Sequence, residues 1–533
     1  MRIRSLLLSA TMLALVATPV AAQRQPSRDV TRPSDEPGDS DAMARGRPDT
    51  VSDPALAQAS AVEDAQPKRG SVAVNGKVIN YTATPGTLTI RNDEGEAIAS
   101  MFYVAYVADR PKGAPERPIT FSFNGGPGSS SMWLHMGSIG PVHIETLTPT
   151  AQPNPPFPIK SNPNTILDHS DVVFLDAIGT GLSRPIGKAK GADFFGVDQD
   201  IDAFARGIMR YLTINDRWNS PKFLFGESYG TLRSSGLVYA LQQRGVQMNG
   251  VILLSSILNY GIRQPGYDQI NVTYLPSYAA TAWYHNRIAN RPAALEPWLT
   301  EVREWARGPY ATALQKGDDL PETERQAIAQ QLSAYTGLSV KYILDSDLRV
   351  SLGRFRKELM RDQHRTVGRL DSRFIGMDVD SAGEEPEFDT TDTSISGPYI
   401  TAQNKYLFGT LGYKTGLSYR PNFYSGIRGK WDQGHQAPGG GAKMALADTA
   451  LDLSAAMRQN PNLKVLSMNG YYDFATPFFG AEYDLKHMQV DPSLRKNIGY
   501  TYYESGHMVY VDPAVHKQFT RDMGAFIDMA SGR

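Results

Sequence analysis

Among the residues that could do chemistry, Ser228 has the sequence context most typical of a nucleophile. It lies at the centre of Gly226-Glu-Ser-Tyr-Gly230, which follows the apolar run 222–225 and precedes a run of mostly small, helix-tolerant residues, 231–240. Small residues two positions before and after a serine let the chain turn sharply from strand to helix, which exposes the hydroxyl. An ordinary glycine-serine turn is the alternative in a chain with 48 glycines. The flanking patterns favour a nucleophile at Ser228.

A nucleophilic serine needs a base, and an imidazole held by a carboxylate is the usual solution. Of the nine histidines, only His507 combines a preceding strand, a glycine neighbour and a position near the C-terminus. The apolar run 465–468 leads into Asp473, which we predict to be the acid, whereas Glu482 and Asp484 are expected to be surface charges. The order serine, acid, histidine is that of α/β-hydrolases.

A glycine-rich loop, Phe123-Asn-Gly-Gly-Pro-Gly-Ser-Ser-Ser131, follows the apolar run 119–123. Backbone N–H groups of such a loop, together with the N–H of the residue after the nucleophile, can stabilise the negative charge that develops during acyl transfer. A flexible linker is the alternative interpretation. Its position directly after a strongly apolar strand favours an oxyanion loop.

The elements that must position these residues form an α/β pattern. The segment 71–107 alternates strand patterns with turns such as Asn75-Gly76, which predicts antiparallel hairpins. Short apolar runs separated mostly by helix-length stretches then predict parallel strands; they are 119–123, 172–175, 223–225, 251–254, 465–468 and 500–503. Reactive groups sit past the carboxyl ends of such strands. We predict a mostly parallel sheet with antiparallel N-terminal strands.

A long insertion separates the strand at 251–254 from the strand at 465–468. Helical patterns within it predict a largely helical cap over residues 260–410, lying above the carboxyl edge of the sheet and controlling access. The acidic stretch 377–396 is expected to be a solvated loop. The hydrolase core would then comprise residues 69–259 and 411–533.

The first residues have the pattern of an export signal. Arg2 and Arg4 precede an apolar run and the small residues 19–22, so we expect a signal peptide over 1–22. Residues 23–68 are poor in large apolar side chains, which predicts a disordered linker. A net charge of −1 offers no footprint for nucleic acid or an anionic membrane, and there is no cysteine. These features predict an exported bacterial protein, periplasmic or extracellular, and leave its oligomeric state open.

Together these motifs resemble those of the serine carboxypeptidase family of α/β-hydrolases. The family's Asn-Gly-Gly-Pro-Gly-Cys-Ser-Ser loop is similar to 124–131, its Gly-Glu-Ser-Tyr-Ala/Gly elbow to 226–230, and its Gly-His-Met-Val motif to 506–509. The strand and turn at 170–183 also resemble a family motif, with Ile178 in place of a proline. Four motifs in the expected order are far more specific than any one.

The resemblance implies a serine exopeptidase that removes residues from peptide C-termini. In that mechanism Ser228 attacks the carbonyl, His507 moves the proton, Asp473 orients the histidine, and the N–H groups of Gly126 and Tyr229 bind the oxyanion. The substrate is then a peptide.

The resemblance also implies a clamp for the terminal carboxylate of the substrate. Asn124 and Glu227 match the positions that bind it, with Glu227 sharing a proton with the carboxylate. Three further positions depart from the family pattern: Ser129 replaces a cysteine, Tyr471 replaces an aspartate, and Ser138 stands where many members have a second clamp glutamate. Either the insertion supplies the missing contact or the enzyme depends less on a free C-terminus.

Two other functions remain open from the sequence. The same triad could act on esters or amides as an esterase, amidase or acyltransferase, which the incomplete clamp supports. A non-enzymatic binding protein would not need Ser228, Asp473 and His507. The chain has no H-E-x-x-H motif, no zinc-like ligand spacing and no phosphate-binding loop, so neither a metal nor a cofactor is expected.

Overall fold

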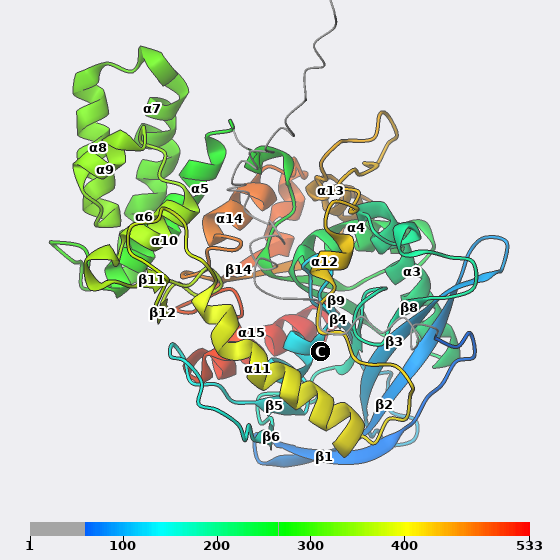
Figure 1. Cartoon of the computed structure of the whole chain (residues 1–533). Coiled ribbons are helices and arrows are strands. Elements are labelled where there is room, and N and C mark those ends of the chain that lie inside the picture. Colours follow the sequence, from blue (N-terminus) through cyan, green and yellow to red (C-terminus); the bar gives the residue numbers. More distant parts are fainter. Residues whose placement is uncertain (1–58, 265) are drawn as a thin grey trace, which may run out of the picture. The chain divides into compact units, whose positions relative to one another are not determined.

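The central element of the fold is a large twisted sheet (Figure 1). The computed structural model describes residues 59–264 and 266–533, so the predicted signal peptide and most of the predicted linker lie outside the described residues. Within these ranges ten strands form the sheet, in the order β1-β2-β3-β7-β4-β9-β10-β13-β14, with β8 paired to β3. The strands are β1 (Lys68–Val74), β2 (Lys77–Arg91), β3 (Ala97–Ala108), β4 (Ile119–Phe123), β7 (Asp171–Leu175), β8 (Arg184–Pro185), β9 (Lys222–Ser228), β10 (Gly250–Ser256), β13 (Lys464–Gly470) and β14 (Ile498–Tyr503).

The pairing confirms the predicted mixture of strand directions. Strands β1, β2 and β3 are antiparallel neighbours, and β3 pairs antiparallel with β7. From β7 through β4, β9, β10 and β13 to β14 every pair is parallel. The carboxyl ends of these six strands therefore share one edge, where the reactive side chains were expected.

Alternate residues of each central strand enter different hydrophobic cores. In β9, Leu224 packs in the core that contains Phe204 and Leu232, whereas Phe223 and Phe225 pack in the core that contains Phe519. This two-residue period is that of a strand covered on both faces, which explains why the run reads as continuously apolar.

Helices cover both faces of the sheet. Those contributing to the first core are α3 (Val197–Ile214), α4 (Tyr229–Gln243) and α13 (Ala450–Gln459). Those contributing to the second core are α2 (Met132–Gly137), α11 (Thr390–Asn404) and α15 (Pro513–Ser531). Two short hairpins lie outside the main sheet: β5 (Val142–Ile144) with β6 (Ile159–Ser161), and β11 (Thr366–Val367) with β12 (Ile375–Gly376).

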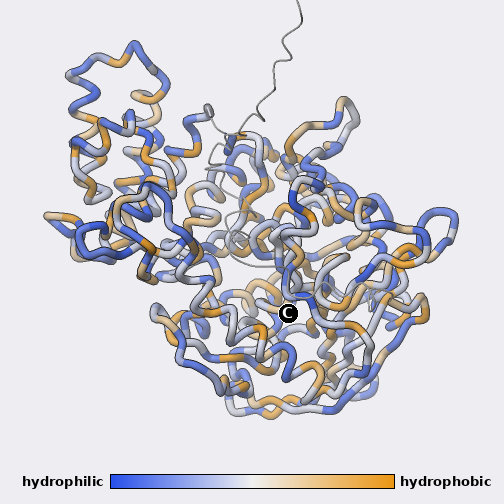
Figure 2. Tube along the Cα trace, viewed as in Figure 1, coloured by the Kyte–Doolittle hydropathy of each residue, from blue (hydrophilic) through white to orange (hydrophobic). Residues whose placement is uncertain are grey.

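Most helices of the insertion build a third hydrophobic core. They are α5 (Gln269–Tyr284), α6 (Leu295–Trp305), α7 (Ala311–Lys316), α8 (Glu322–Thr336), α9 (Val340–Asp345) and α10 (Leu352–Glu358). Figure 2 shows hydrophilic and hydrophobic residues interspersed along most of these helices, as expected for helices with one exposed side. Helix α5 is the exception, since its residues 272–282 are all buried. This core also includes Phe474 and Phe478, the latter the first residue of α14 (Phe478–Lys486), so the cap packs directly on the chain that follows β13.

Two parts of the predicted domain plan differ from the structure. Helix α11 begins at Thr390, inside the stretch expected to be a loop, because the Asp389 side chain caps it by accepting a hydrogen bond from the Thr391 N–H (3.1 Å). Figure 1 shows α11 apart from α6 to α9, and it packs against α2 and β5 of the core. The final helix of the predicted cap thus belongs to the hydrolase core.

The last residues of the predicted linker are folded onto the sheet. The N–H of Gln66 donates to the carbonyl of Pro85 (3.0 Å), the N–H of Thr87 donates to the carbonyl of Asp64 (2.8 Å), and Glu63 pairs with Arg210 (2.6 Å). Backbone pairing with β2 compensates for the scarcity of large apolar side chains in this segment.

The two acids expected on the surface are buried at the junction of cap and core. Asp484 pairs with Arg263 (2.9 Å), and Glu482 pairs with Arg303 of α6 (3.0 Å). All four side chains are at most 9% exposed. The predicted surface position of these two acids was wrong because their arginine partners come from the insertion, roughly two hundred residues away in sequence. No local sequence pattern indicates such a pairing. Within the described residues there is no helix long and apolar enough to cross a membrane.

Candidate active site

Ser228 lies at a sharp turn between strand and helix. It is the last residue of β9, and α4 begins at Tyr229. Its φ of 61° and ψ of −132° are a strained conformation for a residue with a side chain. A Cβ atom at Gly226 would lie 2.1 Å from the carbonyl oxygen of Gly230, so glycine is required there for the turn to close. This is the geometry of a nucleophile elbow.

The predicted acid and base are hydrogen-bonded to each other. His507 Nδ1 donates to Asp473 Oδ2 at 2.8 Å, and both side chains are buried. The other carboxylate oxygen, Oδ1, accepts from the N–H groups of Ala475 (2.7 Å) and Thr476 (3.0 Å). Asp473 is therefore held in place by the backbone. Because Nδ1 carries the proton in this bond, Nε2 of a neutral His507 is available to accept one from a substrate or a nucleophile.

The electrostatic balance at His507 favours the imidazolium. Burial disfavours the charged ring, but the negative charge of Asp473 and its hydrogen bond outweigh burial, so the pKa of His507 is raised above its ordinary value. The same carboxylate would stabilise the imidazolium that forms when the ring takes a proton during catalysis.

The loops that carry Asp473 and His507 are joined by their backbones. The N–H of Tyr471 donates to the carbonyl of Tyr503 (3.0 Å), and the N–H of Tyr472 donates to that of Ser505 (3.0 Å). These bonds continue the pairing of β13 with β14 beyond the sheet. The relative position of acid and base is thus fixed by strand register.

The glycine-rich loop after β4 makes close backbone contact with the elbow. A Cβ atom at Gly125 would lie 2.5 Å from the backbone nitrogens of both Tyr229 and Gly230, so only glycine permits this approach. Tyr229 is the first residue of α4, and its N–H consequently has no acceptor within the helix. Gly126 lines the same pocket as Ser228. The two predicted oxyanion donors therefore lie on adjoining segments.

Asn124 and Glu227, the predicted carboxylate clamp, form a buried pair. Asn124 Nδ2 donates to Glu227 Oε1 (2.9 Å), and Asn124 Oδ1 accepts from the N–H of Leu134 (3.0 Å), which fixes the orientation of the amide. Burial raises the pKa of Glu227 to about 7, against the lowering effects of His507, the Tyr510 hydroxyl and Asn124. Although Tyr510 faces this carboxyl, Oε2 of Glu227 has no hydrogen-bond partner within the described part of the chain.

Ser138 does not replace the missing clamp residue. Its hydroxyl donates back to the carbonyl of Leu134 (2.5 Å), and its own carbonyl accepts from His516 (2.7 Å) and Asn162 (2.9 Å). These polar atoms of Ser138 all bond within the core. Ser138 is absent from the described lining of the pocket.

One pocket brings the predicted residues together with others that the sequence did not reveal. It contains about 760 Å³ of empty space, its open mouth included. Ser228, His507, Glu227, Asn124 and Gly126 line it. Lining residues missed by sequence reasoning include Trp133, Arg369, Leu370, Asp392, Asn422 and Tyr424. Most of these come from the insertion or the segment after it, and no motif marks them.

The described residues contain no group of three or more histidine, cysteine, aspartate or glutamate side chains that could hold a metal ion. The groups that the site offers for chemistry are a hydroxyl, a carboxylate-held imidazole, two backbone donors and a carboxyl group with a raised pKa.

A comparison with protein families finds a match. A model of the family described as serine carboxypeptidase matches residues 77–303, the segment that contains the glycine-rich loop and the elbow. This part of the chain matches the serine carboxypeptidase family, which is the family predicted from the motifs.

Solved structures show the same fold. A prohormone-processing carboxypeptidase from Saccharomyces cerevisiae aligns with a TM-score of 0.52 at 14% identity, covering 85% of this chain and 91% of the yeast chain. A putative aryl esterase from Burkholderia cenocepacia aligns at 0.35 and 13% identity, covering 84% and 100% of the two chains. A proline iminopeptidase from Mycobacterium smegmatis aligns at 0.34 and 12% identity, covering 84% and 98%. No curated protein sequence matches the chain. The alignment with the yeast carboxypeptidase confirms the predicted α/β fold.

Proposed function

We propose that this protein hydrolyses the C-terminal peptide bond of peptides through a Ser228-His507-Asp473 triad and an acyl-enzyme. The observation that carries the proposal is the shared pocket. Ser228 and His507 line it together with Asn124 and Glu227, which are hydrogen-bonded to each other. This arrangement supports a substrate site where a nucleophile acts beside a carboxylate-recognition group.

In this mechanism the hydroxyl of Ser228 attacks the scissile carbonyl while Nε2 of His507 accepts its proton. The N–H groups of Gly126 and Tyr229 stabilise the oxyanion of the tetrahedral intermediate. The protonated His507 then donates to the leaving amine, which releases the C-terminal amino acid and leaves an acyl-enzyme on Ser228. Water, deprotonated by His507, hydrolyses this ester and restores the enzyme.

Glu227 supplies the exopeptidase specificity in this proposal. Its carboxyl is protonated over much of the acidic range because its pKa is raised to about 7 by burial. A protonated Oε2 can donate a hydrogen bond to the terminal carboxylate of the substrate, and the fixed amide of Asn124 can add a second donor. The proposal includes export of the chain, as the pattern of residues 1–22 predicts.

A second candidate is an esterase, amidase or acyltransferase that uses the same triad. The position of Ser138 favours it, because the hydroxyl bonds to the carbonyl of Leu134 and cannot help to bind a carboxylate. This candidate predicts no preference for substrates with a free C-terminus.

Three matched substrates separate the two candidates: an N-blocked dipeptide, its C-terminal amide and its ester. A carboxypeptidase cleaves the free acid with a higher kcat/KM than the amide, whereas equal or reversed preference supports the second candidate. Ser228→Ala should lose several orders of magnitude in kcat while substrate binding persists. A fluorophosphonate should label the parent at Ser228; labelling of another serine would contradict the triad.

A further inference from the structure

A hairpin of the insertion forms part of the wall of the active-site pocket. Strands β11 and β12 bracket residues 368–374, and Arg369 and Leu370 of this turn line the pocket. The carbonyl of Arg369 accepts from the N–H of Phe474 (3.0 Å), and the carbonyl of Leu370 accepts from the N–H of His507 (2.6 Å). The turn is thus bonded directly to the loops that carry the acid and the base.

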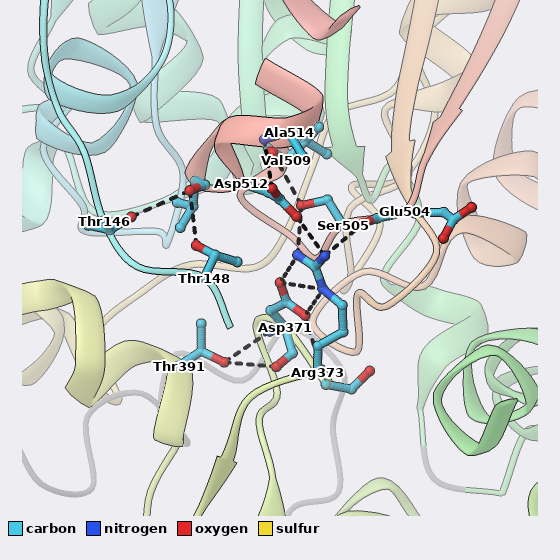
Figure 3. A network of polar contacts seen from close by, with 12 residues as sticks. Thr146, Thr148, Asp371, Arg373, Thr391, Glu504, Ser505, Val509, Asp512 and Ala514 are labelled. Atoms are coloured by element: carbon cyan, nitrogen blue, oxygen red, sulfur yellow. Dashed lines mark hydrogen bonds and ion pairs between the residues drawn. The ribbon is translucent and has the colours of Figure 1, made fainter. Parts of the chain in front are cut away.

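A network of charged groups holds this turn in place (Figure 3). The guanidinium of Arg373 pairs with Asp371 (2.6 Å) and with Asp512 (2.7 Å), and it also donates to the carbonyl of Glu504 (2.8 Å), three residues before His507. Arg373 therefore links the insertion to both ends of the loop that carries the catalytic histidine.

The backbone around Arg369 is fixed from the other side as well. The two oxygens of Asp389 accept from the N–H groups of Arg369 (2.8 Å) and Leu370 (3.0 Å). Because both neighbouring peptide groups are bonded, the Arg369 side chain starts from a rigid backbone. Rigid support of this kind is what a recognition side chain requires.

The side chain of Arg369 is buried without a full set of partners. The residue is 5% exposed, and its Nη1 is inaccessible to water and has no hydrogen-bond partner in the described ranges. A guanidinium is always charged and carries five N–H donors, so leaving one buried and unsatisfied is costly. Besides burial and Asp473, the positive charge of Arg369 also acts on the pKa of His507, which it lowers. Arg369 is therefore close enough to the catalytic centre to affect a bound substrate.

We propose that Arg369 binds the terminal carboxylate of the peptide substrate and supplies the contact that Ser138 cannot make. This inference rests on the proposed carboxypeptidase function and makes Arg369 a specificity-determining residue. A guanidinium forms charge-assisted, often bidentate hydrogen bonds with a carboxylate, which fits an anionic C-terminus facing Nη1. Asp392 of α11 lines the same pocket, and its Oδ1 accepts from Ser396 Oγ (3.0 Å).

This form of recognition differs from a clamp made of acids alone. Glu227 can bind the terminal carboxylate only while it holds a proton, whereas Arg369 attracts the ionised carboxylate at any pH at which the protein is folded. The substrate class is therefore a peptide with a free, ionised C-terminus. Peptide amides and esters lack the group that Arg369 recognises.

The test compares Arg369→Gln with a matched control, Arg365→Gln. Arg365 precedes β11, its guanidinium donates to the carbonyl of His364, and it does not line the pocket, so the control removes the same charge from the same hairpin. The measured quantity is the ratio of kcat/KM for an N-blocked dipeptide acid to that for its amide. We expect this ratio to fall by about one to two orders of magnitude in Arg369→Gln, the usual contribution of a hydrogen bond to a charged group. It should stay at the parent value in Arg365→Gln, and Arg369→Lys should restore part of it.

An unchanged ratio in Arg369→Gln, with both substrates equally slowed or equally fast, would overturn the inference. A binding measurement keeps it testable apart from peptidase activity. Calorimetry with the N-blocked dipeptide acid and its amide on Ser228→Ala, with and without Arg369→Gln, measures carboxylate recognition directly. If the parent proves to be an esterase but Arg369→Gln weakens binding of the acid selectively, the proposed function fails and the carboxylate site stands. If the parent cleaves peptide acids and Arg369→Gln does not change binding, the proposed function stands and the carboxylate site at Arg369 fails.

Discussion

Replacing Glu227 by glutamine should remove the loss of activity at alkaline pH for substrates with a free C-terminal carboxylate. Glu227 lies next to the nucleophile and its Oε1 accepts from Asn124. Glutamine keeps a hydrogen-bond donor in this position at every pH, whereas the carboxyl donates only when it is protonated. The variant therefore separates donation of the hydrogen bond from titration of the group.

The size of the effect follows from the raised pKa of Glu227, about 7. With that value the carboxyl is about half protonated at pH 7, about a tenth at pH 8 and about a hundredth at pH 9. If the protonated form binds the substrate carboxylate, kcat/KM for a peptide acid falls by up to tenfold, roughly, for each pH unit above 7. Binding by Arg369 makes the decline shallower without reversing it.

His507 sets the opposite limb of the profile. It must be neutral to accept the proton of Ser228, and its pKa is raised, so activity on every substrate increases as pH rises through that value. Since Glu227 and His507 interact, the two limbs report values that belong to the pair. A peptide acid should give a bell-shaped profile, while an amide or ester should give only the rising limb.

The assay is kcat/KM from pH 5 to 9 for matched acid and amide substrates. Glu227→Gln should lose the alkaline decline for the acid. The amide should keep a single rising limb, moved to lower pH because the Glu227 charge that raises the pKa of His507 is gone. Glu504→Gln is the matched control, since Glu504 is exposed and close to His507 along the chain. Coincident acid and amide profiles in the parent, or an alkaline decline that persists in Glu227→Gln, would show that Glu227 does not sense the carboxylate.

Two further predictions concern stability and backbone packing. The pKa of Glu227 rises from 4.5 to about 7 on folding. Ionisation of this carboxyl therefore destabilises the folded state progressively between pH 4.5 and pH 7, and the full loss is reached above pH 7. In denaturant unfolding, Glu227→Gln should be more stable than the parent by up to about 3 kcal/mol at pH 8 and similar to it at pH 4. Equal differences at both pH values would contradict this. Gly125→Ala places a Cβ 2.5 Å from the backbone nitrogens of the elbow, and kcat should fall by roughly 10²- to 10³-fold. Gly308→Ala, whose Cβ meets open space, is the control and should keep parental kcat.

The sheet could be predicted from the sequence because each buried strand carries its own local signal. Runs such as 119–123 and 223–225 are short, apolar and bounded by turn residues, and the structure places both at the centre of the sheet. The residues predicted to act together also follow strands. Because the carboxyl ends of parallel strands share one edge of the sheet, the sequence could predict that Ser228 and His507 lie close together, and both line one pocket.

The wall of the pocket could not be predicted because it depends on contacts between distant segments. Arg369 has no motif around it, and its position depends on Asp389, twenty residues later, and on Phe474 beyond the insertion. The burial of Asp484 likewise depends on an arginine from the cap. The charge of Asp484 predicted a position on the surface. That prediction was wrong because a buried ion pair can be recognised only when the positions of both partners in the fold are known.

The bond from the His507 N–H to the carbonyl of Leu370 limits how this protein can be engineered or rearranged. If an insertion contacted the core only through its two ends, it could be replaced by the insertion of another enzyme. The substrate preference of that enzyme would then be transferred with it. Here the β11–β12 hairpin is part of the framework that holds His507. A chimera that replaces residues 260–410 would remove Arg373, and with it the support of the loop that begins at Glu504. A graft that alters preference while keeping turnover must retain the hairpin and exchange only the helices α5 to α10.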